Sequence, residues 1–320
     1  MKEAYFLKQL EEELVVALGC TEPVAVAYAA ALARKEAGKE KIEAIDLKAS
    51  VNIYKNAMGV FIPGTQEMGA AMAAALGATG GRPDLGLQVL QDLEEEQIQE
   101  ARELVAQGRV TSAPAPPQSP SLYIDISIKT KNHRGRAVVA WKHDLIMELE
   151  SDGQTHFHNE LSHMQEMGEV ITPDDLKEIW SFAQKVDLDD LDIIRQAILL
   201  NDRIAEEGLT RGYGLEVGPS IAERHNPAGK PLDKANFSLS DYCAARTAAA
   251  ADARMAGASF PVMSNSGSGN QGLTVTVPVL SAARYLDASE EALIRAQTLS
   301  HLVAIHVKKS YGRQIGRAYV

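Results

Sequence analysis

Two alanine-rich runs constrain the fold of this sequence more than any other feature. Residues 25–33 read AVAYAAALA, and residues 244–258 read AARTAAAADARMAGA. Alanine is the strongest helix former, and its small side chain lets neighbouring helix backbones approach closely. Aromatic residues make up only 5% of the chain, so small side chains dominate the expected contacts. The sequence therefore predicts a body of closely packed helices.

The composition limits the classes of partner. The chain has 320 residues, which is enough for one large domain or two ordinary ones. A formal net charge of -11 argues against a nucleic-acid partner and favours a small metabolite or a protein. Two cysteines in a chain of this length do not indicate a secreted disulfide scaffold.

The N-terminal segment, MKEAYFLKQLEEELVVALG, carries acidic residues where a signal peptide would be apolar. It has the pattern of an amphipathic helix instead. No apolar run reaches the length of about 18 residues that a membrane span needs. We therefore expect a cytoplasmic protein with no membrane contact, and the oligomeric state stays open, a homodimer included.

The order of the patterns predicts an α+β fold. A helix is expected over residues 1–18 and another over residues 21–37, with Thr21 as N-cap and Pro23 in the first turn. Alternating and β-branched residues over 42–62 indicate strands. The stretches LYIDISIKT, RAVVAWKHD and LIMELESDGQTHFHN predict a small antiparallel sheet with a Ser-Asp-Gly turn.

These elements group into two parts. We expect a mostly helical, small-residue body formed by residues 1–40 and 165–320, with an α/β section inserted at residues 41–164. The small antiparallel sheet belongs to the inserted section.

A bare polar loop, SNSGSGNQG at residues 264–272, precedes the apolar stretch LTVTVPV. Glycines let a backbone reach positive φ and let a ligand approach the N–H groups, and a helix starting near Gln271 would direct its positive end at that ligand. The neutral polar residues are Ser264, Asn265, Ser266, Ser268, Asn270 and Gln271. The glycines also match GxGxxG spacing, but no βαβ unit surrounds them. The residues leave two interpretations open, a carboxylate-binding loop and a plain polar connector.

The stretch GCTEP is a predicted elbow between two helices. Cys20 would lie at the start of the second helix, where the helix dipole stabilises a thiolate, so it is a candidate nucleophile or metal ligand. The alternative is a buried small hydrophobe. Glu22 is a candidate base, or it is an acid that favours the first turn of the helix. Cys243 lies in an alanine-rich helix and is expected in the core.

Several other polar residues are candidates on composition alone. Asn52, Lys55 and Asn56 precede a Pro-Gly turn, where a solvated strand end explains them equally well. Arg254 lies in an otherwise apolar helix just before the glycine loop, and it could pair with a substrate carboxylate or with an acid such as Asp252.

Two groups of histidines have the same ambiguity. His156 and His158, with His163 nearby, have the spacing of a zinc pair on a strand, but no further ligand set accompanies them and we favour a structural role. His301 lies on the apolar face of a helix and belongs either to the core or to a site.

Five ordered blocks resemble the cysteine desulfidase family, which is similar to the alpha chain of iron–sulfur L-serine dehydratases. The blocks are GCTEPVAVAYAAALA, VNIYKNAMGVFIPGT, RTAAAADARMAG, SNSGSGNQGLTVTVPV and LSHLVAIHVKKSYGR. They extend from the N-terminus to about Arg313, nearly the whole chain, and five blocks in order are far more specific than any single motif.

The resemblance implies a lyase that eliminates the β-substituent of L-cysteine or L-serine, giving pyruvate and ammonia, with sulfide from cysteine. It implies a [4Fe–4S] cluster held by three cysteines, with Cys20 as one ligand and an open iron acting on the leaving group. Glu22, Lys55 and Ser266 become the catalytic candidates. The candidates for substrate binding are Asn52, Asn56, Ser264, Asn265, Ser268, Asn270, Gln271 and Arg254.

The sequence departs from the family pattern near its C-terminus. In the family, the last block continues into a Cys-Gly-Cys segment and later helices with a late cysteine, whereas here SYGR is followed by QIGRAYV. Cys243 matches neither missing ligand. We therefore expect a C-terminally incomplete relative, and the alternative function is a cluster-free member that only binds a small amino or hydroxy acid. The choice between L-cysteine and L-serine stays open.

Overall fold

The computed structural model describes residues 2–160, 173–210, 212–225, 234 and 236–310. The chain divides into two compact units, one formed by Met1–Ala17 and Glu166–Arg313 and the other by Leu18–Gln165 and Gln314–Val320. The first is called the helical unit and the second the sheet unit. Together they confirm the predicted α+β class, with helices in the majority and one large mixed sheet.

The sheet unit is built on six strands in the order β3-β2-β4-β5-β6-β7. The strands are β2 (Ile42–Ala49), β3 (Val110–Pro114), β4 (Tyr123–Thr130), β5 (Arg134–Ala140), β6 (Ile146–Ser151) and β7 (Gln154–His158). Only β2 and β3 pair in parallel, while β2 and β4 to β7 form an antiparallel run. The predicted Ser-Asp-Gly turn joins β6 to β7, with positive φ at Asp152 and Gly153.

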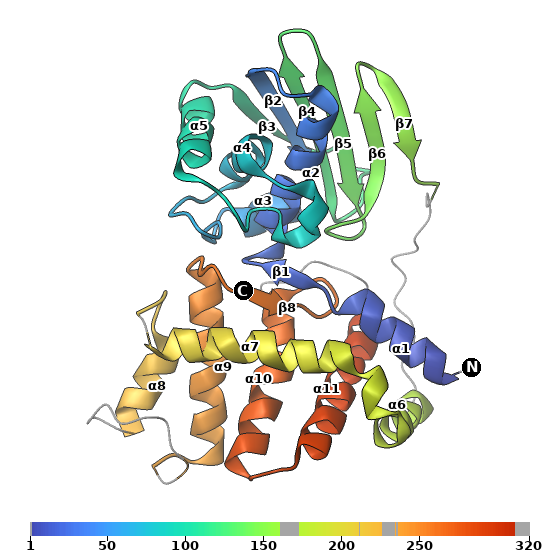
Figure 1. Ribbon diagram of the computed structural model, residues 1–320, viewed down its shortest axis with the longest axis vertical. Helices are drawn as coiled ribbons and strands as arrows, with labels where there is room; N and C mark the ends of the chain where they lie inside the picture. The colour runs from blue at the N-terminus through green and yellow to red at the C-terminus, as the bar shows by residue number, and fades with distance from the viewer. Residues whose placement is uncertain (1, 161–172, 211, 226–233, 235, 311–320) are drawn as a thin grey trace. The chain divides into compact units, whose positions relative to one another are not determined.

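Helices cover one face of this sheet (Figure 1). They are α2 (Thr21–Ala37), α3 (Val51–Ala57), α4 (Ala70–Gly80), the short 3-10 helix η1 (Pro83–Gln88) and α5 (Glu95–Ala106). The pattern of β2 shows the cause, because buried Ile45, Leu47 and Ala49 alternate with exposed side chains. The residues 18–40, which the sequence analysis grouped with the helical body, therefore lie with the sheet. Whether the units are independent domains stays a prediction.

The alanine run of α2 allows very short approaches between backbones. A Cβ added to Gly77 of α4 would lie 2.1 Å from the carbonyl oxygen of Ala27, and one added to Gly135 of β5 would lie 2.1 Å from that of Ala33. Only glycine fits at either contact. The alanine run and the two glycines are thus parts of one packing arrangement, which confirms that close helix packing was the right interpretation of the alanines.

The helical unit contains α1 (Lys2–Glu13), α6 (Pro173–Lys185), η2 (Leu188–Asp190), α7 (Asp192–Thr210), α8 (Val217–His225), α9 (Leu239–Met255), α10 (Gly269–Tyr285) and α11 (Glu290–Ser310). Helix α7 crosses α9, α10 and α11 (Figure 1). A short strand, β8 (Pro261–Met263), pairs with β1 (Val16–Leu18) in a separate two-stranded sheet. The predicted first helix was therefore too long, because the chain leaves it after Glu13 to form β1.

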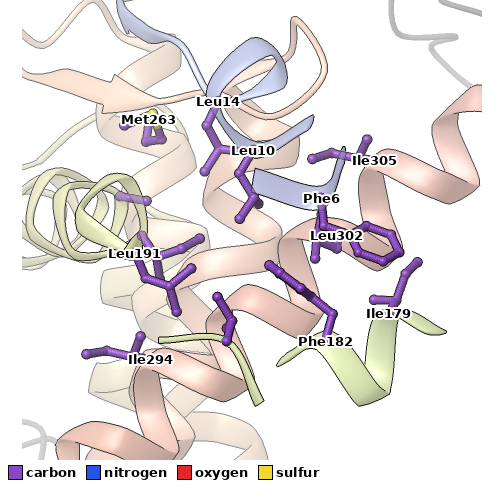
Figure 2. Close-up of a cluster of buried hydrophobic side chains, with 13 residues drawn as sticks. Phe6, Leu10, Leu14, Ile179, Phe182, Leu191, Met263, Ile294, Leu302 and Ile305 are labelled. Atoms are coloured by element: carbon purple, nitrogen blue, oxygen red, sulfur yellow. The ribbon is translucent and has the colours of Figure 1, made fainter. Parts of the chain in front are cut away.

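A cluster of apolar side chains joins α1, α6 and α11 inside the helical unit. Figure 2 shows Phe6, Leu10, Phe182 and Leu302 converging, with Met263 of β8 at the margin. The rings of Phe6 and Phe182 lie 5.0 Å apart between centroids. Because apolar burial is the main favourable term in folding, this cluster is what holds the N-terminal helix on the unit. Among the described residues, no helix is long and apolar enough to cross a membrane.

The strand predicted over residues 51–57 is wrong. The alternation over 42–62 was interpreted as strand throughout, but Val51–Ala57 form helix α3 after β2 ends at Ala49. Ile53 and Ala57 lie four residues apart and are both fully buried, which is the spacing of one helix face. This four-residue spacing was the signal that the alternation obscured.

Candidate functional site

The glycine loop at residues 264–272 begins with a tight two-residue turn. Asn265 and Ser268 exchange backbone hydrogen bonds, with N···O distances of 3.1 and 3.0 Å. The residues between them, Ser266 and Gly267, both have positive φ, at 48° and 78°. Two positive φ values are required by the hairpin turn that matches the twist of its strands, so Gly267 has a conformational explanation. The turn extends the β1–β8 pairing, because Ser266 N also donates to Glu13 O at 2.9 Å.

Close packing requires the other two glycines of the loop. A Cβ on Gly269 would lie 2.4–2.5 Å from atoms of the Arg254 guanidinium, and a Cβ on Gly272 would lie 2.0 Å from the carbonyl oxygen of Met263. All three glycines are therefore explained within the helical unit. The first turn of α10 lies directly on the backbone of β8 and on a buried arginine.

The loop side chains bond chiefly to one another and to nearby backbone. Ser264 Oγ donates to Val15 O at 2.6 Å. The side-chain oxygen of Asn265 accepts from Ser266 Oγ at 3.0 Å and from Gln271 Nε2 at 2.8 Å. Ser264 and Asn265 are buried, and Ser266 and Gln271 are half-buried. Several donors that the sequence analysis assigned to a ligand carboxylate are thus used inside the loop.

Behind Asn265 lies a fully buried histidine. Asn265 Nδ2 lies 3.1 Å from His301 Nδ1 and donates to the His301 carbonyl oxygen at 3.2 Å. On the other side of the ring, Nε2 lies 3.1 Å from Thr276 Oγ1. Burial lowers the pKa of His301 to about 4, so the ring is neutral at ordinary pH. His301, left open between core and site above, therefore contacts the loop directly.

Asn201 of α7 completes this buried network. Its side-chain oxygen accepts from Met263 N at 2.8 Å, and its Nδ2 donates to Thr276 Oγ1 at 3.0 Å. Neither Asn201 nor Thr276 was predicted from the sequence. The available signal for Asn201 was its place in the apolar run AILLNDRIA, where a lone amide needs buried partners.

Arg254 is 2% exposed and lies behind the start of α10. Its Nη1 donates to Asn270 Oδ1 at 2.8 Å, which connects two of the predicted substrate-binding residues. Asp252 has a different partner, since its carboxylate accepts from Gly218 N at 3.2 Å. Arg254 therefore supports the loop through its hydrogen bond to Asn270. A role in binding a substrate carboxylate stays a prediction.

Ser268 caps helix α10, because its Oγ accepts from Gln271 N at 3.3 Å. We expect Ser268→Ala to lower the free energy of unfolding of the helical unit by about 1 kcal/mol, the usual cost of losing an N-cap. Urea unfolding followed by Trp180 fluorescence in a Trp141→Phe background would measure the loss within this unit. Ser268→Asn, which keeps a capping oxygen, should recover most of it; equal losses in both variants would show that the cap contributes nothing.

The elbow of the sheet unit brings together three predicted residues. Cys20 Sγ donates to Glu22 Oε2 at 3.0 Å, and Asn56 Nδ2 donates to Glu22 Oε1 at 2.9 Å. Thr21, which was predicted as the N-cap, is the first helical residue, and its Oγ1 also donates to Glu22 at 3.1 Å. Cys20 and Glu22 are 8% and 7% exposed. The elbow is therefore a buried carboxylate with three side-chain donors at the N-terminus of α2, where the helix dipole also favours a negative charge.

The other candidates of the sheet unit lie apart from these contacts. Lys55 is exposed and Asn52 is half-buried, both on α3. His156 and His158 are exposed on β7, and His156 Nε2 lies 2.7 Å from Glu36 Oε2. His163 lies outside the described residues. Among those described, no group of three or more metal-ligating side chains could hold a metal ion.

The cysteines of these 320 residues do not fit a [4Fe–4S] cluster. Such a cluster is held by cysteine thiolates, commonly four, and the sequence has two cysteines. Cys20 donates its thiol proton to Glu22 in the sheet unit, whereas Cys243 lies in the helical unit with its Sγ 3.5 Å from Pro278 O. Burial raises the pKa of the Cys243 thiol, which opposes the thiolate that iron requires.

Comparisons with known proteins identify relatives of this chain. The family model described as "Serine dehydratase alpha chain" matches residues 84–314, which include the glycine loop, Arg254 and His301. A protein of Oleidesulfovibrio alaskensis, named only "UPF0597 protein", is 44% identical over 309 residues, covering 96% of this chain and 71% of the relative. Proteins of the same name from Shewanella woodyi and Aeromonas hydrophila are 39% and 40% identical, covering 96% and 95% of this chain and 71% and 68% of the relatives. No solved structure matches the chain.

Proposed function

Because the chain belongs to the serine dehydratase alpha chain family, we propose that it is a lyase that eliminates the β-substituent of a small amino acid, L-serine or L-cysteine. The products would be pyruvate and ammonia, with sulfide from cysteine. The observation that carries this proposal is that the family match covers the glycine loop and the helices that hold it. The loop is the part of the helical unit where polar side chains concentrate beside a neutral buried histidine.

In this proposal the chain's own residues have separate tasks. The buried Glu22 carboxylate is the candidate base at the elbow, where the side chains of Cys20, Thr21 and Asn56 donate to it and fix its orientation. Ser266 and Gln271 contact the substrate's polar groups at the loop. Lys55, exposed on α3, stays a catalytic candidate by resemblance alone. The family is associated with an iron–sulfur cluster, but because the cysteines present do not fit one, no step of the reaction is assigned to it.

The cysteine content favours a second candidate function. Two cysteines in two different units cannot supply the thiolates of a cubane from this chain. A protein that keeps the loop but not the cluster would bind a small amino or hydroxy acid without converting it. This alternative predicts ligand binding with no pyruvate.

Anaerobic purification with iron and sulfide, followed by iron analysis and a pyruvate assay with L-serine and L-cysteine, separates the two functions. The lyase proposal predicts pyruvate release that falls by about 100-fold or more in Glu22→Gln, the usual effect of removing a general base. Cys20→Ala, which removes one donor to Glu22 Oε2, should lower activity less than Glu22→Gln does.

The matched control is Cys243→Ala, because Cys243 Sγ donates to the backbone carbonyl of Pro278 and lies outside both candidate sites. It should keep wild-type activity. No pyruvate from any preparation, together with L-serine binding by calorimetry, would reject the lyase proposal and favour the binding function. Activity that survives Glu22→Gln would reject the role of Glu22 alone.

A further inference from the structure

The hydrogen bonds around His301 fix which ring nitrogen carries the proton. Asn265 Nδ2 is 3.2 Å from the His301 carbonyl oxygen, which can only accept, so this amide cannot be turned over. The same Nδ2 faces His301 Nδ1 at 3.1 Å, so Nδ1 must be the acceptor.

The other side of the ring agrees with this assignment. Thr276 Oγ1 donates to Gly272 O at 2.7 Å, and Asn201 Nδ2 donates to Thr276 Oγ1 at 3.0 Å. The orientation of the Asn201 amide is fixed, because its Oδ1 accepts from Met263 N. With its proton on the short bond to Gly272 O, Thr276 Oγ1 accepts from His301 Nε2 at 3.1 Å. The Asn265 side requires the neutral Nε2–H form, and the Thr276 side fits it.

The protonation of His301 also fixes the orientation of Asn265, and through Asn265 that of the loop side chains bonded to it. With its Nδ2 directed at His301, Asn265 presents Oδ1 to the loop, where it accepts from Ser266 Oγ and Gln271 Nε2. The Ser266 hydroxyl proton is thus directed inward, and its oxygen lone pairs remain for the outside. Gln271 Oε1 is directed away from Asn265 and accepts from Lys308 Nζ at 3.4 Å, so it is already used. The acceptor that the half-buried surface of the loop offers is therefore Ser266 Oγ.

We infer that His301 is a positioning residue that, through Asn265, orients Ser266 so that its oxygen receives the ammonium group of an amino acid. This inference rests on the proposed function and gives the loop a specific task in it. It differs from the sequence-based expectation of a carboxylate-binding loop, which stays a prediction, in that it starts from the loop donors that bond to Asn265. The ligand class that fits is a molecule with a hydrogen-bond donor at its α-carbon.

NMR with ¹⁵N-labelled histidine tests the first step without any ligand. The His301 signals, identified by their absence from His301→Asn, should show the Nε2–H form from pH 7.5 to pH 5. Asn265→Asp places an acceptor opposite Nδ1 and should move the proton onto that nitrogen. A wild-type His301 that carries its proton on Nδ1, or an Asn265→Asp variant with an unchanged ring, would overturn the inference whether or not the protein is an enzyme.

Calorimetric binding of L-serine and of L-glycerate, which carries a hydroxyl in place of the ammonium, tests the second step without turnover. Losing one hydrogen bond to the ammonium should weaken L-serine binding by about 10-fold in Ser266→Ala and in His301→Leu, and change L-glycerate binding less than about twofold. His301→Asn keeps an acceptor near the Nδ1 position and should restore L-serine affinity.

A merely structural histidine predicts equal weakening for both ligands, and that result would overturn the positioning role. Failure of the wild-type chain to bind L-serine would overturn the assignment of the ammonium group. Binding with the expected selectivity, but no pyruvate, would support the inference while rejecting the lyase proposal.

Discussion

Replacing Gly272 with alanine is expected to destabilise the helical unit by about 3 kcal/mol, at the upper end of the usual cost of overpacking a core. The added Cβ would lie 2.0 Å from the carbonyl oxygen of Met263 and 2.9 Å from the Cα of Ser264. Both atoms belong to backbone, so no side chain can rotate away. Helix propensity alone would make alanine more stable than glycine at this position, so a loss of stability would have to come from the clash.

The cost should be large because the displaced backbone is also bonded. Asn201 of α7 connects the two elements, because its Oδ1 accepts from Met263 N of β8 and its Nδ2 donates to Thr276 Oγ1 of α10. Moving α10 away from β8 would weaken these buried bonds, and a buried polar group without a partner costs about 1–3 kcal/mol. The steric and polar terms therefore act together.

Urea unfolding followed by Trp180 fluorescence, in a Trp141→Phe background, would report on the helical unit for this variant. Gly212→Ala in the same unit is the control, because a Cβ there meets only the end of the flexible Glu216 side chain and its φ is not positive. It should change the free energy of unfolding by less than about 1 kcal/mol. A Gly272→Ala variant as stable as the control would show that α10 moves from β8 at little cost.

The glycine loop shows which parts of a site a single sequence can predict. The pattern SNSGSGNQG was enough to identify an unusual loop before a helix, because three glycines and no charge have few local explanations. The pattern could not show whether a glycine is needed to let a ligand approach the backbone or to let two elements pack closely. Gly269 and Gly272 contact residues that are distant or lie on another element, Arg254 and Met263, and only the fold brings these together.

The direction of the hydrogen bonds in the loop could likewise not be predicted from the sequence. A serine or a carboxamide can donate or accept, and its direction is set by its neighbours. Here the direction is set by His301, which lies 36 residues after Asn265. The elbow was easier to predict, because Cys20 and Glu22 are two residues apart, although only the fold shows that Asn56 of α3 donates to Glu22.

Acidification should destabilise the helical unit through His301 by up to about 3 kcal/mol. Burial lowers the pKa of His301 from 6.5 to about 4 in the folded chain, and a difference of one pKa unit corresponds to about 1.4 kcal/mol. The unfolded chain binds the proton at higher pH than the folded chain does. This contribution to stability is therefore fully present above pH 6.5 and is lost as the pH falls toward 4.

The groups that face His301 give no compensation for a positive charge. Its ring contacts the amide of Asn265 and the hydroxyl of Thr276, and Asn201 lies behind that hydroxyl. A second proton on Nδ1 would point at the N–H of Asn265.

His133 in the sheet unit contributes to the pH dependence of stability with the opposite sign, because its hydrogen bond to Asp152 raises the pKa of that exposed ring. Its contribution is present at low pH and lost as the pH rises.

Comparing the wild type with His301→Asn at each pH removes the contribution of every other group. Urea unfolding of the helical unit, followed by Trp180 in the Trp141→Phe background, should show the wild type losing about 2 kcal/mol more than the variant between pH 7 and pH 4.5. Parallel curves for the two proteins would mean that His301 titrates alike in the folded and unfolded chains. That result would also remove the reason to regard the ring as a fixed neutral support for the loop.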